Sequence, residues 1–174
     1  MLSSNKTQRI LRISIGLLLV VLAGAIVDAL RDKVVGVGDK APDFRVTTDS
    51  GRTISRSNFG GRLLVLNFWA TWCPPCVQEM PSLEQFQRRL APSGVVVLGV
   101  SVDKSDRAYR EFLGKTKVSF LTARDPSAEI SGEYGTFKFP ETYVIDASGR
   151  VVQKHIGPEV WTNENLIQQI QALL

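Results

Sequence analysis

The chain has 174 residues, of which 44% are apolar and 22% are charged, and its formal net charge is +4. A chain of this length and composition can bury one compact core without disulfide staples. Five of the 21 Lys and Arg residues and two of the 17 Asp and Glu residues lie in residues 1–33, so the remainder is nearly neutral. A nearly neutral domain without a basic stripe argues against nucleic acid as a partner.

The first segment differs from the rest of the chain in composition. Residues Ile10–Leu30 are almost wholly apolar, with no charge between Arg12 and Asp28. A membrane-spanning helix needs about 20 apolar residues, whereas a cleaved export signal is shorter and ends at small residues such as those at 23–25. We favour an uncleaved single-pass anchor because the uncharged stretch continues past residues 23–25. We therefore expect an anchor or signal segment, residues 1–33, and an exported domain, residues 34–174.

Strands and helices alternate through the second segment. The apolar run Leu63–Phe68 predicts a strand buried on both faces, and a helix is expected to begin at Cys73 and end near Leu90. The run Val95–Val102 predicts a parallel partner strand, which makes a right-handed βαβ unit. A β-hairpin at 44–54 is expected to precede this unit and to prolong the edge of its sheet. After the unit we expect a helix at 106–115, an edge strand at 120–122, a helix at 128–134, a hairpin of strands 141–145 and 150–155, and a helix from about 163.

The two cysteines of the chain lie two residues apart where the first buried strand meets its helix. If Cys73 caps the helix, Pro74 and Pro75 fall in the first turn, where a proline costs no helical hydrogen bond. A thiolate at Cys73 then lies at the positive end of the helix dipole, which lowers a cysteine pKa. Cys76 is buried one turn further on and can attack a mixed disulfide formed at Cys73.

Three other interpretations of the cysteine pair do less well. A structural zinc site needs four ligands, and the chain offers only the two cysteines and His155. A covalent haem needs a histidine directly after the second cysteine, where this chain has Val77. A static disulfide stays open, although a loop this small constrains the unfolded chain little. We therefore expect no metal site.

Three segments carry a resemblance to a known family. FWATWCPPC resembles the active-site motif of the thioredoxin superfamily. The segments VGDKAPDF, WCPPCVQEMP and YGTFKFPETYVIDASGR are similar to the membrane-anchored ResA, TlpA and DsbE (CcmG) group of extracytoplasmic thiol–disulfide oxidoreductases. The resemblance implies an α/β thioredoxin-like fold, with a central mixed sheet flanked by helices, an N-terminal β-hairpin extension and a central strand–helix insertion. It implies a redox-active disulfide and no other cofactor.

The resemblance also assigns residues to the substrate side of the site. Pro140 corresponds to the cis-proline that faces the CxxC motif, where the backbone of Phe139 can pair with an extended substrate; a trans edge-strand proline is the alternative. Glu141, the residue after this proline, resembles the residue at the same position in the reductases of cytochrome maturation. The residues expected to contact substrate are Trp72, Pro74, Pro75, Phe139 and Glu141.

Proton transfer is expected to depend on a glutamate. Asn67 occupies the position where thioredoxins have a buried aspartate, and an asparagine cannot accept a proton. Glu79 lies one helical turn beyond Cys76, and a partly buried carboxylate there has a raised pKa and can take the proton of Cys76. A solvent-facing Glu79 is the alternative.

These features together predict an extracytoplasmic protein-disulfide reductase. Two prolines between the cysteines remove N–H donors that would hold a thiolate, which makes the pair comparatively reducing. By resemblance, the expected partners are the CxxCH cysteines of apocytochrome c, or a copper-site thiol pair in oxidase assembly, and a membrane-bound thiol–disulfide electron donor. A general disulfide oxidase or isomerase, and a copper-delivery protein on the same fold, are the alternatives.

Overall fold

The computed structural model describes residues 3–29 and 34–174. Internal contacts divide the chain into two units, residues 1–33 and 34–174, and each is described separately. The boundary that we expected at residue 33 lies outside the described residues.

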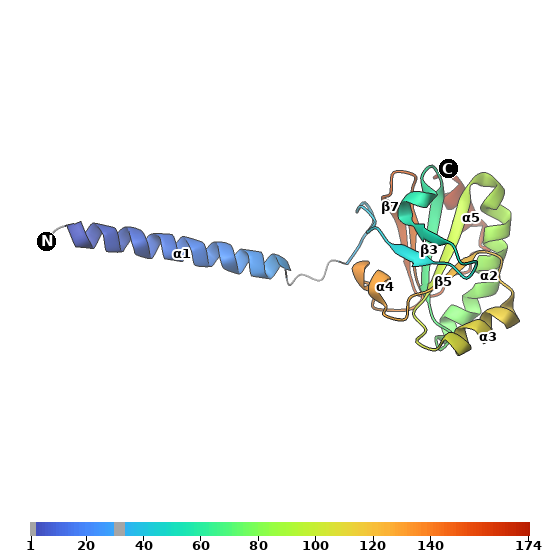
Figure 1. The fold of residues 1–174 in the computed structure, drawn as a ribbon. Coiled ribbons are helices and arrows are strands. Elements are labelled where there is room, and N and C mark those ends of the chain that lie inside the picture. The colour runs from blue at the N-terminus through green and yellow to red at the C-terminus, as the bar shows by residue number, and fades with distance from the viewer. Residues whose placement is uncertain (1–2, 30–33) are drawn as a thin grey trace. The chain divides into compact units, whose positions relative to one another are not determined.

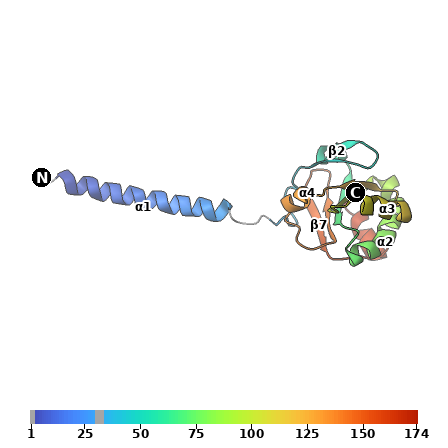
Figure 2. The ribbon, with the colours of Figure 1, turned by 60° about the horizontal axis from the view of Figure 1, so that its bottom comes forward.

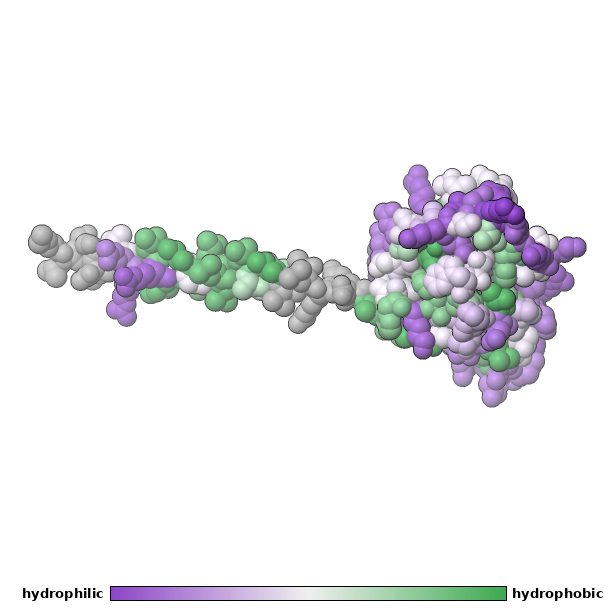
Figure 3. All heavy atoms as spheres, turned by 90° about the horizontal axis from the view of Figure 1, so that it is seen from below, coloured by the Kyte–Doolittle hydropathy of each residue, from purple (hydrophilic) through white to green (hydrophobic). Residues whose placement is uncertain are grey.

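The first unit is a single apolar helix, α1 (Ser3–Ala29). Its stretch Thr7–Ile26 has a mean hydropathy of 2.1 and is long enough to cross a membrane. Figure 3 shows hydrophobic side chains along the middle of this helix and hydrophilic ones toward its N-terminal end. The length, composition and N-terminal place of this helix fit a membrane anchor or a signal segment.

The second unit contains a five-stranded mixed sheet (Figure 1). Its strand order is β5-β4-β3-β6-β7, with β3 at the centre. β3 pairs with β4 in parallel and with β6 antiparallel, and all seven residues of β3 are buried. The thioredoxin-like arrangement predicted from the resemblance is therefore confirmed. The strands are β3 (Leu63–Trp69), β4 (Val95–Ser101), β5 (Leu121–Arg124), β6 (Glu141–Ile145) and β7 (Val151–Ile156).

Helices cover the two faces of this sheet unequally. One core lies on the side of α2, α3 and α5, the three longer helices of the domain, and includes Val65 and Trp69 of β3. Helices α2 and α3 lie together on this side in Figure 2. Leu64, Leu66 and Phe68 of β3 point to the other core, which a short helix and the N-terminal hairpin cover. The helices are α2 (Pro74–Leu90), α3 (Asp106–Thr116), α4 (Glu129–Glu133) and α5 (Glu164–Gln171), with 3₁₀ turns η1 (Arg56–Phe59) and η2 (Ala91–Ser93).

The N-terminal hairpin forms as predicted but does not prolong the main sheet. Strands β1 (Arg45–Thr47) and β2 (Thr53–Ser55) make a separate two-stranded sheet, joined to β5 by one isolated bridge, Thr48 to Ala123. The reason is burial: Val46 and Ile54 face each other across the hairpin and both point into the core of the main domain. The hairpin therefore covers a face of the sheet, and the expectation of a longer edge was wrong.

Candidate active site

The cysteines lie at the junction of the central strand and its helix. Cys73 is the N-cap residue of α2 and Pro74 is its first residue, as the sequence predicts. Cys73 and Cys76 are joined by a disulfide, with their Cα atoms 5.3 Å apart, and Sγ of Cys73 accepts a hydrogen bond from the Cys76 amide at 3.3 Å. Cys73 is 6% exposed and Cys76 is fully buried. The sulfur of Cys73 is therefore the one that an incoming group can reach first.

A buried aspartate holds the loop that leads into Cys73. The carboxylate of Asp103 accepts hydrogen bonds from the amide of Thr71 at 2.9 Å and from its hydroxyl at 2.6 Å. It also accepts the hydroxyl of Ser101, at the end of β4, at 2.6 Å. Asp103 is 1% exposed, so these three donors replace the water that its charge would otherwise require. The position of the loop before Cys73 is thus fixed from the end of the neighbouring strand.

The residues expected on the substrate side surround this loop. Trp72 is 63% exposed, and its ring lies edge-on to the ring of Phe139 with their centroids 6.1 Å apart. The Phe139–Pro140 peptide bond is cis, as the resemblance predicts. Pro74 is exposed and Pro75 is half-buried. The contact between the two rings brings the cysteine loop and the segment before β6 together.

Glu79 is buried on the inner face of α2 at 3% exposure, which excludes the solvent-facing alternative. Its Oε1 accepts a hydrogen bond from Nδ2 of Asn67 at 2.8 Å. Its Oε2 accepts one from the amide of Glu159 at 3.1 Å and one from Nε1 of Trp161 at 3.3 Å. Burial raises the pKa of Glu79 above its usual 4.5, although these three donors oppose the shift. The carboxylate one turn from Cys76 is therefore suited to hold a proton at a higher pH than an exposed glutamate.

Glu141 lies on the opposite side of the sheet from Glu79. Its side chain is fully buried, and its Oε1 binds Nζ of Lys154 at 2.7 Å and accepts the hydroxyl of Tyr143 at 2.6 Å. Lys154 in turn donates to the carbonyl of Val35 at 2.9 Å. We expected Glu141 among the residues that contact substrate, but its carboxylate has no exposed surface for such a contact. The next side chain, Thr142, points to the Glu79 side and accepts from Asn67.

Sequence reasoning did not identify three members of the site: Asp103, Thr142 and Trp161. For Asp103 a signal existed, because polar residues that follow a parallel strand lie at the edge where α/β proteins place their sites. Thr142 and Trp161 have no such signal, since their roles depend on which distant side chain they meet.

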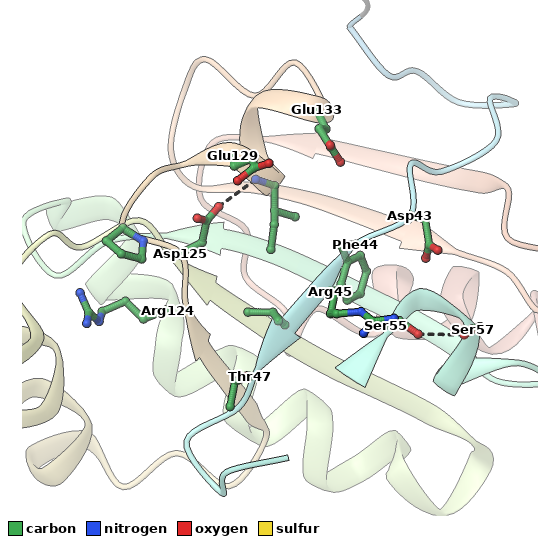
Figure 4. A pocket seen from close by; sticks show the side chains of 13 residues that line it. Asp43, Phe44, Arg45, Thr47, Ser55, Ser57, Arg124, Asp125, Glu129 and Glu133 are labelled. Carbon is green, nitrogen blue, oxygen red and sulfur yellow. Dashed lines mark hydrogen bonds between the residues drawn. The ribbon is translucent and has the colours of Figure 1, made fainter. Parts of the chain in front are cut away.

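Other candidate sites are less informative. His155 has its ring nitrogens 3.1 Å from Glu159 and 3.3 Å from Gln153, and within residues 3–29 and 34–174 no group of three or more His, Cys, Asp or Glu side chains is arranged to hold a metal ion. A surface hollow of about 660 Å³ lies between the hairpin and α4 (Figure 4). Asp125 on its wall is bound to the amide of Ile130, and Arg124 is paired with Asp106. None of the cysteine-site residues lines this hollow.

A mixed sheet with a cysteine pair at the start of the helix after its central strand defines a thioredoxin-like protein. Residues 36–170 match the Redoxin family model. The chain therefore belongs to the Redoxin family and, within it, to the thioredoxin-like ResA/DsbE group.

Several known proteins are similar to this chain over most of its length. The thiol–disulfide oxidoreductase ResA of Bacillus cereus is 31% identical over 163 residues, which are 90% of this chain and 93% of that protein. The thioredoxin-like protein YneN of Bacillus subtilis is 35% identical over 150 residues, which are 82% of this chain and 88% of that protein. A solved structure, a putative thiol:disulfide interchange protein DsbE from Chlorobium tepidum, is 34% identical with a TM-score of 0.74, and covers 80% of this chain and 98% of its own.

Proposed function

We propose that this protein is a thiol–disulfide oxidoreductase that works on the extracytoplasmic side of a membrane and reduces disulfides in exported proteins. The observation that carries the proposal is the Cys73–Cys76 disulfide, with one cysteine at the surface of the helix start and the other fully buried. An attacking thiol and a resolving thiol need this difference in access. The thiol–disulfide oxidoreductase relatives support the same chemistry.

The reaction begins from the dithiol form. The Cys73 thiolate attacks one sulfur of a substrate disulfide, a new S–S bond forms, and the other substrate sulfur leaves as a thiolate that takes up a proton. Cys76 then loses its proton and attacks Sγ of Cys73, which releases the second substrate sulfur as a thiol. Two electrons pass to the substrate, and the protein is left with the Cys73–Cys76 disulfide. A membrane-bound thiol–disulfide donor, the other proposed partner, returns the two electrons.

Glu79 is the proposed acceptor of the Cys76 proton. It lies three residues beyond Cys76 on the same helix and is buried with it, so the proton need not pass through bulk water. An ionised Glu79 also repels a neighbouring thiolate and raises the pKa of the thiol. The two prolines between the cysteines remove N–H donors that would stabilise a thiolate, and both effects favour a reducing pair.

The substrate side is proposed to be the surface around Trp72. The exposed ring of Trp72, the half-buried ring of Phe139 and the prolines after Cys73 lie around the disulfide. An extended polypeptide laid across them would present a cysteine pair to Cys73, as the CxxCH segment of an apocytochrome c would, or a copper-site thiol pair. Helix α1 is proposed to be a single-pass anchor that keeps residues 34–174 at the outer surface of the cytoplasmic membrane.

Two measurements on the full chain in detergent test this proposal. In the first, Cys76→Ser is expected to accumulate a mixed disulfide with an oxidised CxxCH peptide, and the matched control Cys73→Ser is expected to form none. Equal amounts of mixed disulfide in both variants, or no mixed disulfide in either, would overturn the mechanism. The absence of any mixed disulfide is also the result expected of a copper carrier. In the second, tryptophan emission is followed across a thiol–disulfide buffer series and gives the reduction potential of the cysteine pair. A potential of about −270 mV, that of thioredoxin, supports a reductase. A potential of about −120 mV, that of the oxidant DsbA, makes the protein an oxidase.

A further inference from the structure

Asn67, Glu79 and Thr142 form a buried polar group between three elements of the fold. Nδ2 of Asn67 on β3 is 2.8 Å from Oε1 of Glu79 on α2 and 2.9 Å from Oγ1 of Thr142 on β6. None of the three residues is more than 3% exposed. One amide nitrogen therefore donates to two oxygens in a place that water does not reach.

The other atom of the same amide has nothing to bind. Oδ1 of Asn67 is buried and has no hydrogen-bond partner among the described residues. A buried acceptor without a donor costs free energy, so such groups are rare and call for an explanation, of which a role in catalysis is one. An asparagine presents either its nitrogen or its oxygen in nearly the same place when its amide turns over.

The surroundings of Glu79 determine which of its oxygens can carry a proton. Oε2 faces two groups that can only donate, the amide of Glu159 and the indole N–H of Trp161. A proton on Oε2 would meet these two N–H groups, whereas Oε1 faces Asn67. The proton of a protonated Glu79 therefore lies on Oε1 and points to Asn67, where the amide must present an acceptor.

We propose that Asn67 is a positioning residue whose amide turns over when Glu79 gains or loses its proton. With Glu79 ionised, Nδ2 donates to the carboxylate and to Thr142, as in this structure. With Glu79 protonated, Oδ1 takes that place and accepts the O–H of Glu79 and the hydroxyl of Thr142, which can donate as well as accept. The inference rests on the proposed role of Glu79 and deepens it, because each proton transfer then includes a turn of this amide.

Few charged groups lie around Glu79 among the residues that the structure describes. Glu159 faces it from the loop after β7 and raises its pKa further, and the ring of His155 lies 3.1 Å from the Glu159 carboxylate. On α2 itself, Cys76 is the titratable group nearest to Glu79 in the sequence, and it does not titrate while it is in the disulfide. Lys154 and Glu141 are paired on the other face of the sheet. A titration of the oxidised protein therefore reports on Glu79, and His155 and Glu159 are the ionisable groups beside it.

The test is a pH titration of the oxidised full chain in detergent micelles by NMR, with labelled glutamate carboxyl carbons and asparagine side-chain nitrogens. We expect the Glu79 carboxyl and the Asn67 amide signals to shift with one common midpoint. In Glu79→Gln the shift of the Asn67 signals is expected to disappear. In Asn67→Leu the midpoint of Glu79 is expected to move to higher pH, because a donor to the charged form is lost.

Val65→Ala is the matched control, since Val65 lies two residues before Asn67 on the same face of β3 and contributes to the same core. It is expected to lower stability and leave the Glu79 midpoint in place. The proposal is overturned if the Asn67 signals stay constant while Glu79 titrates, if Glu79 does not titrate, or if Asn67→Leu moves the midpoint no more than the control. Because the disulfide stays closed, this outcome is independent of the trapping experiment that tests the proposed function.

Discussion

Replacing Lys154 with methionine removes the cation of a buried ion pair and keeps most of the side chain's length. The pair is well enclosed: the side chain of Lys154 is 10% exposed, that of Glu141 is not exposed, and Nζ lies 2.7 Å from Oε1. Nζ also donates to the carbonyl of Val35 and lies 4.9 Å from the centre of the Tyr143 ring. In the Lys154→Met variant Glu141 keeps the neutral hydroxyl of Tyr143 as its donor, while its Oε2 already has no partner among the described residues.

The expected cost of Lys154→Met is about 3–5 kcal/mol of unfolding free energy, the range seen when one partner of a buried pair is removed. This is a large part of the roughly 5–15 kcal/mol that holds a typical domain folded. Most of the cost comes from the uncompensated charge and not from the lost attraction. The double variant Glu141→Gln/Lys154→Met removes both charges and is therefore expected to recover most of the loss.

Urea unfolding of the full chain in detergent, followed by tryptophan emission, measures this cost. All three tryptophans of the chain lie in residues 34–174, so the signal reports on the domain and not on α1. The double-variant cycle gives the coupling between the two charges directly. A loss below about 1 kcal/mol for Lys154→Met, the size of an exposed pair, would refute the reasoning. A double variant as unstable as the single one would refute it as well.

Two further predictions concern the buried carboxylates near the cysteines. Because burial raises the pKa of Glu79 above 4.5, the native state binds more protons than the unfolded state in the interval between the two pKa values, and stability falls as the pH rises through it. The free energy of unfolding of Glu79→Gln, relative to that of the parent protein, is therefore expected to increase as the pH rises above 4.5. Urea unfolding at a series of pH values measures this difference, and a difference that decreases with pH would contradict the prediction. Asp103→Asn replaces one carboxylate oxygen by an N–H₂ group, which can no longer accept from the donors that face it. It is expected to cost about 1–3 kcal/mol in the same assay and to slow reduction of a protein disulfide, because the loop before Cys73 loosens. An Asp103→Asn variant with parental stability and rate would show that the carboxylate does not hold the loop.

Much of the site follows from local signals in the sequence. The apolar run ending at Phe68, the cysteine pair and the prolines after Cys73 predict a strand, an N-cap and a helix start, and the structure has all three. These features depend on residues that are close to one another in the sequence, so they can be predicted from it. The final hairpin and the last helix, capped by Asn163, were predictable for the same reason.

The partners of Glu79 were not predictable, because they come from distant parts of the chain. Glu159 and Trp161 donate to it across 80 and 82 positions, from the loop after β7. Which loop residue reaches the carboxylate depends on the register between β6 and β7, and nothing in residues 157–161 marks them as donors. The N-terminal hairpin shows the same limit: its two strands are visible in the sequence, but the surface that Val46 and Ile54 cover is a property of the assembled core.

The strand that follows Pro140 is fixed by polar contacts on both of its faces. Glu141 binds Lys154 on one face, and Thr142 binds Asn67 on the other. Because side chains alternate along a strand, a slip of β6 by one residue would exchange these faces and leave a buried carboxylate without its cation. Such a slip costs far more than a mismatch of apolar side chains, since an unpaired buried charge is costly in a way that an imperfect apolar contact is not. The two buried carboxylates thus differ in use: Glu79 is the proposed proton acceptor of Cys76, and Glu141, bound to Lys154, holds the register of the strand that follows Pro140.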